Sequence, residues 1–195
     1  MNVSISEFEN FRRRVPDGDN RERFVCDHCT WIHYDNPRVI STALCVENGH
    51  ILLCRRAIRP RYGFWTLPGG FMELGETAQD AAHRESFEEA GASVSATSLL
   101  GVYSIPRIGQ VHLVYLTRLN SPEITAGPES LDVAMVPISD IPWDELAFPV
   151  NHWTIRDYLS LKGQPPAQPF SITPERLVDR MSSVDCHPDY SLPQS

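Results

Sequence analysis

Three glutamates, Glu85, Glu88 and Glu89, lie close together in the chain, shortly after a glycine-rich turn that contains Gly70. In a helix, at about 100° per residue, Glu85 and Glu89 would share a face with several alanines. Like charges one helical turn apart repel each other, and burying them without a positive partner costs far more. A solvent-exposed acidic face is the usual meaning of such a charge run, but the alanines argue against it. We therefore expect a cation here, and an all-oxygen set of ligands suits Mg²⁺ or Mn²⁺ better than zinc.

Residues 78–90 are predicted to form the helix that carries these glutamates. Thr77 and Asp80 have the spacing of a capping box, and Gly91 suits a C-terminal cap. Apolar and β-branched segments on both sides of this helix predict strands, and an Asn-Gly pair marks a hairpin turn between the first two. The predicted strands are 38–46, 50–56, 98–105, 110–119 and 131–137, and a second helix is predicted from Asn151 or Thr154 to about Leu161. These patterns alone predict a domain of mixed α and β structure.

The spacing of glycine, acidic and basic residues around the first helix resembles the Nudix box, the signature of Nudix hydrolases. After Gly70 come five residues and Glu76, then seven residues and the run Arg84-Glu85-Ser86-Phe87-Glu88-Glu89-Ala90-Gly91-Ala92. Two apolar positions depart from the common pattern, because Ser86 replaces a bulky aliphatic residue and Ala92 is small. The resemblance implies an α/β/α sandwich with a mixed β-sheet.

The same resemblance implies roles for the residues of the box. It assigns divalent metal to Glu85, Glu88 and Glu89, with help from Glu76 or from the carbonyl of Gly70. Arg84 would pair with a glutamate of the box and orient it. Metal ions would neutralise a diphosphate and lower the pKa of bound water, and a nearby glutamate would accept one proton. Glu129 stands in a loop where related enzymes bring a glutamate to the metals, as a base or an extra ligand, and an ordinary solvated loop acid is the alternative.

The flanking residues resemble one branch of the family, the zinc-ribbon Nudix hydrolases associated with ADP-ribose and FAD pyrophosphatase activity. This resemblance runs from about residue 23 to residue 159, with Gly69 in place of a common alanine. It implies metal-dependent hydrolysis of a nucleoside diphosphate linked to another moiety, with release of AMP. Two alternatives are a nucleoside triphosphate pyrophosphohydrolase and a sensor that binds an ADP-ribose type of ligand without hydrolysing it.

Several side chains are candidates to hold the substrate. Arg55 and Arg56 lie near the approach to the box, and arginine forks suit phosphate oxygens. Tyr103 is a candidate to stack on a ring of the substrate, with a place in the core as its alternative. Gln110 and His112 alternate on one strand face, from which they would reach a ribose or a base.

Cys26 and Cys29 form half of a zinc ribbon. A structural zinc takes four protein ligands, and the preceding residues contain neither cysteine nor histidine. A remnant ribbon is therefore favoured over bound Zn²⁺. We divide the chain into an incomplete ribbon-like segment at 1–37, a Nudix domain at 38–162 and a proline-rich tail at 163–195.

The composition fits one soluble domain with modest extensions, since the 195 residues are 42% hydrophobic and carry a formal net charge of −8. The acidic balance argues against nucleic acid and membrane as partners, which leaves a small-molecule nucleotide. The N-terminus lacks the apolar stretch of a signal peptide, so we expect a cytoplasmic protein, with a removed transit peptide as an open alternative. The family resemblance implies a homodimer.

Overall fold

The chain is described by a computed structural model that covers residues 10–164 and 166–171, and it divides into two compact units, Met1–Pro37 and Arg38–Ser195. The first unit holds a small antiparallel sheet of β1 (Phe11–Arg14), β2 (Arg23–Cys26) and β3 (Ile32–His33). Trp31 packs edge-on against Phe11 in this unit, with ring centroids 5.7 Å apart. The sequence patterns did not predict these short strands, two of which contain arginine.

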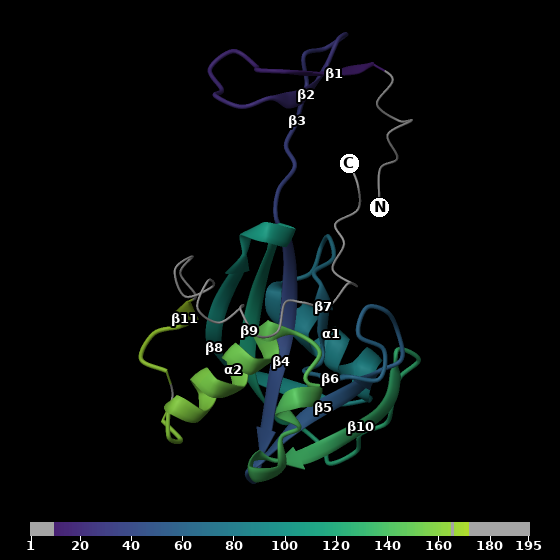
Figure 1. Cartoon of the computed structure of the whole chain (residues 1–195), viewed down its shortest axis with the longest axis vertical. Coiled ribbons are helices and arrows are strands. Elements are labelled where there is room, and N and C mark those ends of the chain that lie inside the picture. The colour runs from purple at the N-terminus through teal and green to yellow at the C-terminus, as the bar shows by residue number, and fades with distance from the viewer. Residues whose placement is uncertain (1–9, 165, 172–195) are drawn as a thin grey trace. The chain divides into compact units, whose positions relative to one another are not determined.

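The second unit is built on an eight-stranded mixed sheet, with the order β10-β5-β4-β9-β8-β11 and with β6 and β7 paired to β5 and β4 (Figure 1). Its strands are β4 (Arg38–Glu47), β5 (His50–Arg56), β6 (Trp65–Thr66), β7 (Gly69–Phe71), β8 (Val94–Ile105), β9 (Gln110–Leu119), β10 (Ser130–Pro137) and β11 (Phe170–Ser171). The pairs β4–β9 and β8–β11 are parallel, and the other pairs are antiparallel. The sheet is therefore mixed, as predicted.

Two helices cover the sheet, α1 (Ala78–Ala90) and α2 (Pro149–Ser160). Successive residues of a strand point to opposite faces, and on β4 Leu44 packs in the core cluster that includes α2, whereas Cys45 packs in the cluster that includes α1. The helices thus lie on opposite faces of the sheet, and Figure 1 shows α2 in front of it. The predicted α/β/α sandwich is confirmed.

The predicted elements agree with the structure to within a few residues. Helix α1 has the predicted bounds, whereas α2 begins at Pro149, before either predicted start, because Pro149 takes the first helical turn, where no N–H is needed. Strand β8 begins at Val94 rather than at residue 98. Within residues 10–164 and 166–171, short 3₁₀ segments lie at Pro106–Ile108, Ile138–Asp140 and Trp143–Glu145.

Most of the predicted tail at 163–195 lies outside the described residues. Of that tail the structure describes 163–164 and 166–171, and β11 in this part pairs with β8 at Gly101 and Val102. In the described ranges, no helix combines the length and the apolar character that a membrane span requires.

Candidate active site

Helix α1 positions the glutamates, and its ends are fixed by the residues that the sequence indicated. The Thr77 hydroxyl accepts a hydrogen bond from the Asp80 N–H at 3.2 Å, and the Asp80 carboxylate accepts one from the Thr77 N–H. Gly91 closes the helix with φ of 60°, in the left-handed region. Ala81 and Ala82 are fully buried, so their face of the helix lies against the sheet. The carboxylates one turn further along this face therefore point into the protein.

Arg84 holds the carboxylates of three glutamates. Its Nη1 donates to Glu85 at 2.8 Å and to Glu88 at 3.0 Å, and its Nη2 donates to Glu76 at 2.9 Å. The hydrogen bonds from Arg84 lower the pKa of Glu76. A further bond from Nη2 to the Phe71 carbonyl, at 3.1 Å, ties the arginine to β7. Arg84 therefore fixes the position of the box glutamates relative to the glycine-rich turn.

Glu89 is the most buried of the acidic side chains on α1, with 7% of its surface exposed. Burial raises its pKa to about 7, although a hydrogen bond from the Gly69 N–H, 3.0 Å long, acts in the opposite direction. Burial also raises the pKa of Glu85, and the charges of Glu85 and Glu129 raise that of Glu89 further. The site therefore brings several carboxylates together where burial disfavours their charged form.

The glycine-rich turn leaves room for these carboxylates. A Cβ atom added to Gly70 would overlap the carboxylate of Glu85, so only glycine allows this close approach. At Gly69 an added Cβ would lie 2.7 Å from the Ser41 carbonyl oxygen, which is backbone and cannot move aside easily. Gly70 thus leaves space for the Glu85 side chain, and Gly69 leaves space for the neighbouring strand β4.

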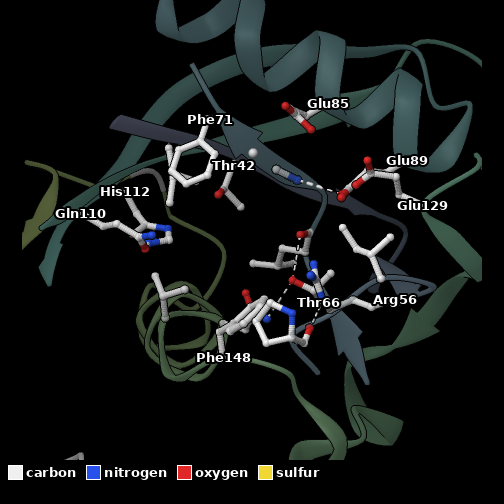
Figure 2. Close-up of a pocket in the computed structure, with 18 of the residues that line it drawn as sticks. Thr42, Arg56, Thr66, Phe71, Glu85, Glu89, Gln110, His112, Glu129 and Phe148 are labelled. Carbon is white, nitrogen blue, oxygen red and sulfur yellow. Dashed lines mark hydrogen bonds between the residues drawn. The ribbon is translucent and has the colours of Figure 1, made fainter. Parts of the chain in front are cut away.

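The loop that carries Glu129 is held against the C-terminal end of α1. Thr125 N–H donates to the Ala90 carbonyl at 2.7 Å, and Gly127 N–H donates to the Glu89 carbonyl at 3.1 Å. On the other side, the Glu129 carbonyl accepts from Ala57 N–H at 2.8 Å. Figure 2 shows the Glu129 side chain beside Glu89. Backbone hydrogen bonds therefore place this loop acid at the cluster.

The oxygen-rich donor set fits a hard divalent cation, because carboxylates crowded together and partly buried gain from a nearby positive charge. In the part of the chain that the structure describes, no group of three His, Cys, Asp or Glu residues already has the arrangement of a metal centre. Arg84 occupies the position between Glu85 and Glu88. Metal binding at these residues would therefore require some of the arginine hydrogen bonds to loosen.

A cavity of about 690 Å³ joins the acidic cluster to an apolar region. In Figure 2, Glu85, Glu89 and Glu129 lie on one side, Gln110 and His112 on the other, and Phe71 and Thr42 between them. Residues of α2 and of the segment before it also line the cavity, among them Phe148 and Asn151. The cavity thus offers a charged end and an apolar end to one ligand.

The structure brings most of the predicted site residues to this cavity. Those that line it are Gly70, Arg84, Glu85, Glu88, Glu89, Glu129, Arg56, Gln110 and His112. Arg55 lies outside the lining and donates to the Gly63 carbonyl at 2.9 Å. Glu76 also lies outside it, where it binds Arg84.

The prediction that Tyr103 stacks on a ring of the substrate is wrong. It is fully buried in the core, and its hydroxyl donates to Asp157 on α2 at 3.1 Å. Stacking needs an exposed ring face, so the alternative, a core residue, describes Tyr103. The aromatic side chains in the cavity lining are instead Phe71 and Phe148. No pattern in the sequence distinguished them, because Phe71 follows two glycines, Phe148 precedes Pro149, and neither stands in a long periodic segment.

Cys26 and Cys29 lie in a tight turn of the first unit, in which Thr30 N–H donates to the Cys26 carbonyl at 3.0 Å. Cys26 is buried and Cys29 is exposed. Hydrogen bonds from the backbone N–H groups of Cys29 and His28 lower the pKa of the Cys26 thiol. The spacing of the two cysteines is that of one half of a zinc ribbon, and zinc binding there stays a prediction.

Comparison with known proteins agrees with this fold and site. A family profile described as NUDIX domain matches residues 35–157, and one described as Nudix N-terminal, for the zinc-ribbon segment, matches residues 9–35. The ADP-ribose pyrophosphatase of Methanocaldococcus jannaschii is 34% identical over 133 residues, 66% of this chain and 77% of that protein. The crystal structure of a NUDIX hydrolase from Nitrosomonas europaea is 40% identical with a TM-score of 0.78, over 83% of this chain and 93% of that one.

A further solved structure contains a nucleotide and a metal. It is a bifunctional NMN adenylyltransferase/ADP ribose pyrophosphatase from Francisella tularensis, complexed with AMP and a Mn ion. It is 28% identical with a TM-score of 0.54, over 66% of this chain and 42% of that one. The chain also spans less than half of the length of some curated relatives.

The sandwich and the carboxylate cluster on its box helix define a hydrolase of phosphoric anhydrides, as predicted. The chain belongs to the Nudix family, and it carries the zinc-ribbon type of N-terminal segment that the resemblance indicated.

Proposed function

We propose that this Nudix enzyme hydrolyses the diphosphate of an ADP-linked compound, ADP-ribose or FAD, and releases AMP. The observation that carries this proposal is the cavity that joins the carboxylates to an apolar region (Figure 2). A substrate with a diphosphate next to a ring system matches both ends at once. The name of the relative from Methanocaldococcus jannaschii, an ADP-ribose pyrophosphatase, supports the same substrate class.

Metal dependence is part of the proposal. Glu85, Glu88 and Glu89, with the carbonyl of Gly70, would hold Mg²⁺ or Mn²⁺. When bound, such an ion neutralises diphosphate charge and lowers the pKa of coordinated water. The Mn ion in the related Francisella tularensis structure is consistent with this choice. We assign Glu76 to positioning Arg84 rather than to the metal, because both of its carboxylate oxygens bind that arginine.

The reaction requires one bond to form and one to break. Water attacks one phosphorus, the bond from this phosphorus to the bridging oxygen breaks, and AMP leaves with the phosphorylated partner. We assign Glu129 as the base that accepts a proton from this water, because its side chain is exposed and lies in the cavity beside Glu89. Arg56 lines the cavity as well, where its guanidinium is 5.0 Å from the ring of Phe148, and we assign it to a phosphate oxygen.

Turnover of a substrate panel by the full chain tests this function. The panel contains ADP-ribose, FAD and nucleoside triphosphates, each with Mg²⁺, with Mn²⁺ and with EDTA, and AMP is measured chromatographically. Glu89→Gln should lower kcat/KM for ADP-ribose or FAD by at least about 100-fold, because it removes a charge at the reacting centre. Glu123→Gln is the matched control, since Glu123 is an exposed acid in the same loop as Glu129 and is absent from the cavity lining.

Each alternative has a distinct outcome in this panel. Turnover confined to triphosphates would make the enzyme a triphosphate pyrophosphohydrolase. Metal-dependent binding of ADP-ribose without turnover of any compound would make it a ligand sensor. Full activity of Glu89→Gln would contradict the assignment of the site. The homodimer and the cytoplasmic location stay predictions.

A further inference from the structure

His112 lines the cavity and carries an unpaired ring nitrogen. The residue lies on β9 and is 8% exposed, and its Nδ1 is buried without a hydrogen-bond partner among the described residues. Three other buried side-chain atoms in that part of the chain share this condition, on Arg61, Thr117 and Thr154, but none of these residues lines the cavity. Leaving a buried polar atom unpaired costs free energy, so the position of His112 calls for a ligand that supplies a partner.

The chemistry of this nitrogen follows from its neighbour. The Nε2 atom lies 3.3 Å from the Oε1 oxygen of Gln110, and an amide oxygen accepts hydrogen bonds but cannot donate them. Burial lowers the pKa of His112 to about 4, so the imidazole is neutral at pH 7 and carries one proton. With this proton on Nε2 and facing Gln110, Nδ1 keeps a lone pair. His112, which lines the cavity, therefore carries an unpaired hydrogen-bond acceptor, and the missing partner is a donor.

The surroundings of His112 indicate which part of a substrate carries that donor. Apolar side chains line the cavity around it, including Ile40, Ile105 and Ile108. Figure 2 shows Phe71 between His112 and the carboxylates. The exposed fraction of Phe71 is 47%. Apolar walls and an exposed aromatic ring suit a flat heteroaromatic base, whereas the hydroxyl groups of a ribose would lose hydrogen bonds to water there.

We propose that His112, oriented by Gln110, reads the edge of the nucleobase by accepting a hydrogen bond from its exocyclic amino group. This inference rests on the proposed function, because it assigns the nucleoside of the substrate to the apolar end of the cavity. It makes His112 a specificity residue that favours adenine over a purine without the amino group. The residue takes no part in the transfer of the phosphoryl group.

Neutral nucleosides test this inference without turnover and without charge repulsion from the glutamates. Adenosine, purine riboside and ribose are titrated into the full chain in EDTA, and binding is followed by NMR, including the ¹⁵N resonances of the histidine rings. Purine riboside differs from adenosine only by the missing amino group. Wild-type protein should bind adenosine about threefold to tenfold more tightly than purine riboside, as expected for one neutral hydrogen bond. Adenosine should also shift the Nδ1 resonance of His112.

Two variants separate recognition from a structural role. His112→Leu removes the acceptor at similar volume, and this variant should bind adenosine and purine riboside about equally. His112→Asn places an amide oxygen near the position of Nδ1 and should restore part of the preference, which a merely structural residue would not do. An unchanged preference in both variants would overturn the proposal. A shift of Nδ1 with ribose as large as that with adenosine would also overturn it, because the donor would then be a hydroxyl.

This design distinguishes failure of the inference from failure of the proposed function. Preference for adenosine that depends on His112, in a protein that hydrolyses none of the panel, would support the base contact and refute the enzyme activity. Hydrolysis of ADP-ribose, together with a preference for adenosine that does not depend on His112, would support the enzyme activity and refute the base contact.

Discussion

Replacing Glu89 by glutamine should stabilise the metal-free protein at neutral and alkaline pH, although it removes a proposed metal ligand. Burial is the main reason that the pKa of Glu89 rises from 4.5 to about 7 in the folded protein. The unfolded chain therefore releases this proton at lower pH than the folded protein does. Ionisation of Glu89 within the fold costs free energy, and the neutral amide of glutamine avoids that cost while its oxygen still accepts the bond from Gly69.

The direction and size of the effect follow from these two pKa values. Below pH 4.5 both states hold the proton, and Glu89 does not destabilise the fold. Between pH 4.5 and about 7 the folded state holds more protons than the unfolded state, so stability falls as pH rises. At 1.36 kcal/mol per pKa unit the full loss is roughly 3 kcal/mol, which is reached above pH 7. From pH 5 to pH 8 the free energy of unfolding of the wild type should fall by about 2 to 3 kcal/mol more than that of Glu89→Gln.

Urea unfolding in EDTA at pH 5, 6.5 and 8 measures this difference. Glu88→Gln is the matched control, because it makes the same change on the same helix at a side chain that is 56% exposed, and its stability should follow the wild type across this range. Addition of Mg²⁺ at pH 8 should stabilise the wild type more than Glu89→Gln. The same dependence of stability on pH in the wild type and in Glu89→Gln would refute the argument that burial raises this pKa.

Three glycine substitutions should separate activity from stability. Gly70→Ala should lower kcat with little change in the urea midpoint, because the added methyl group displaces the movable carboxylate of Glu85, whereas Gly69→Ala should destabilise the fold because it meets the backbone of β4. Equal loss of stability in both would contradict this distinction. Gly127→Ala should cost about 1 to 3 kcal/mol in urea unfolding, since its Cβ would overlap the Glu88 carbonyl, and a neutral effect would show that the loop can move away from α1.

The parts of the site that the sequence predicted are those with local causes. The capping box of Thr77 and Asp80, the cap at Gly91 and the 3.6-residue period of the box helix depend on residues near one another in the chain. Alternation along β9 was enough to place Gln110 and His112 on one face.

The remaining features depend on contacts between distant segments. Phe148 and Asn151 reach the cavity because the segment before α2 is bonded to β6, where the Ala147 N–H donates to the Trp65 carbonyl at 2.7 Å. Asn151 also donates to Thr66, 85 residues away in the chain, at 3.1 Å. Strand periodicity does not tell which face of β8 meets a helix, so the burial of Tyr103 against α2 could not be decided from its neighbours in sequence. The hydrogen bonds that hold the Glu129 loop on α1 involve backbone atoms, which carry no sequence pattern.

The attachment of that loop to α1 limits how the length of the chain can vary. Surface loops commonly accept insertions, and the connection between β9 and β10 would be an obvious place for them. Thr125 and Gly127 are fixed to the end of the helix, and Ala57 fixes Glu129, so one extra residue between 125 and 129 would move the carboxylate by up to about 3.5 Å. An insertion at 121–123 would leave these bonds in place. In proteins that keep this site, the spacing from Thr125 to Glu129 should therefore be constant even where the loop before it grows or shrinks.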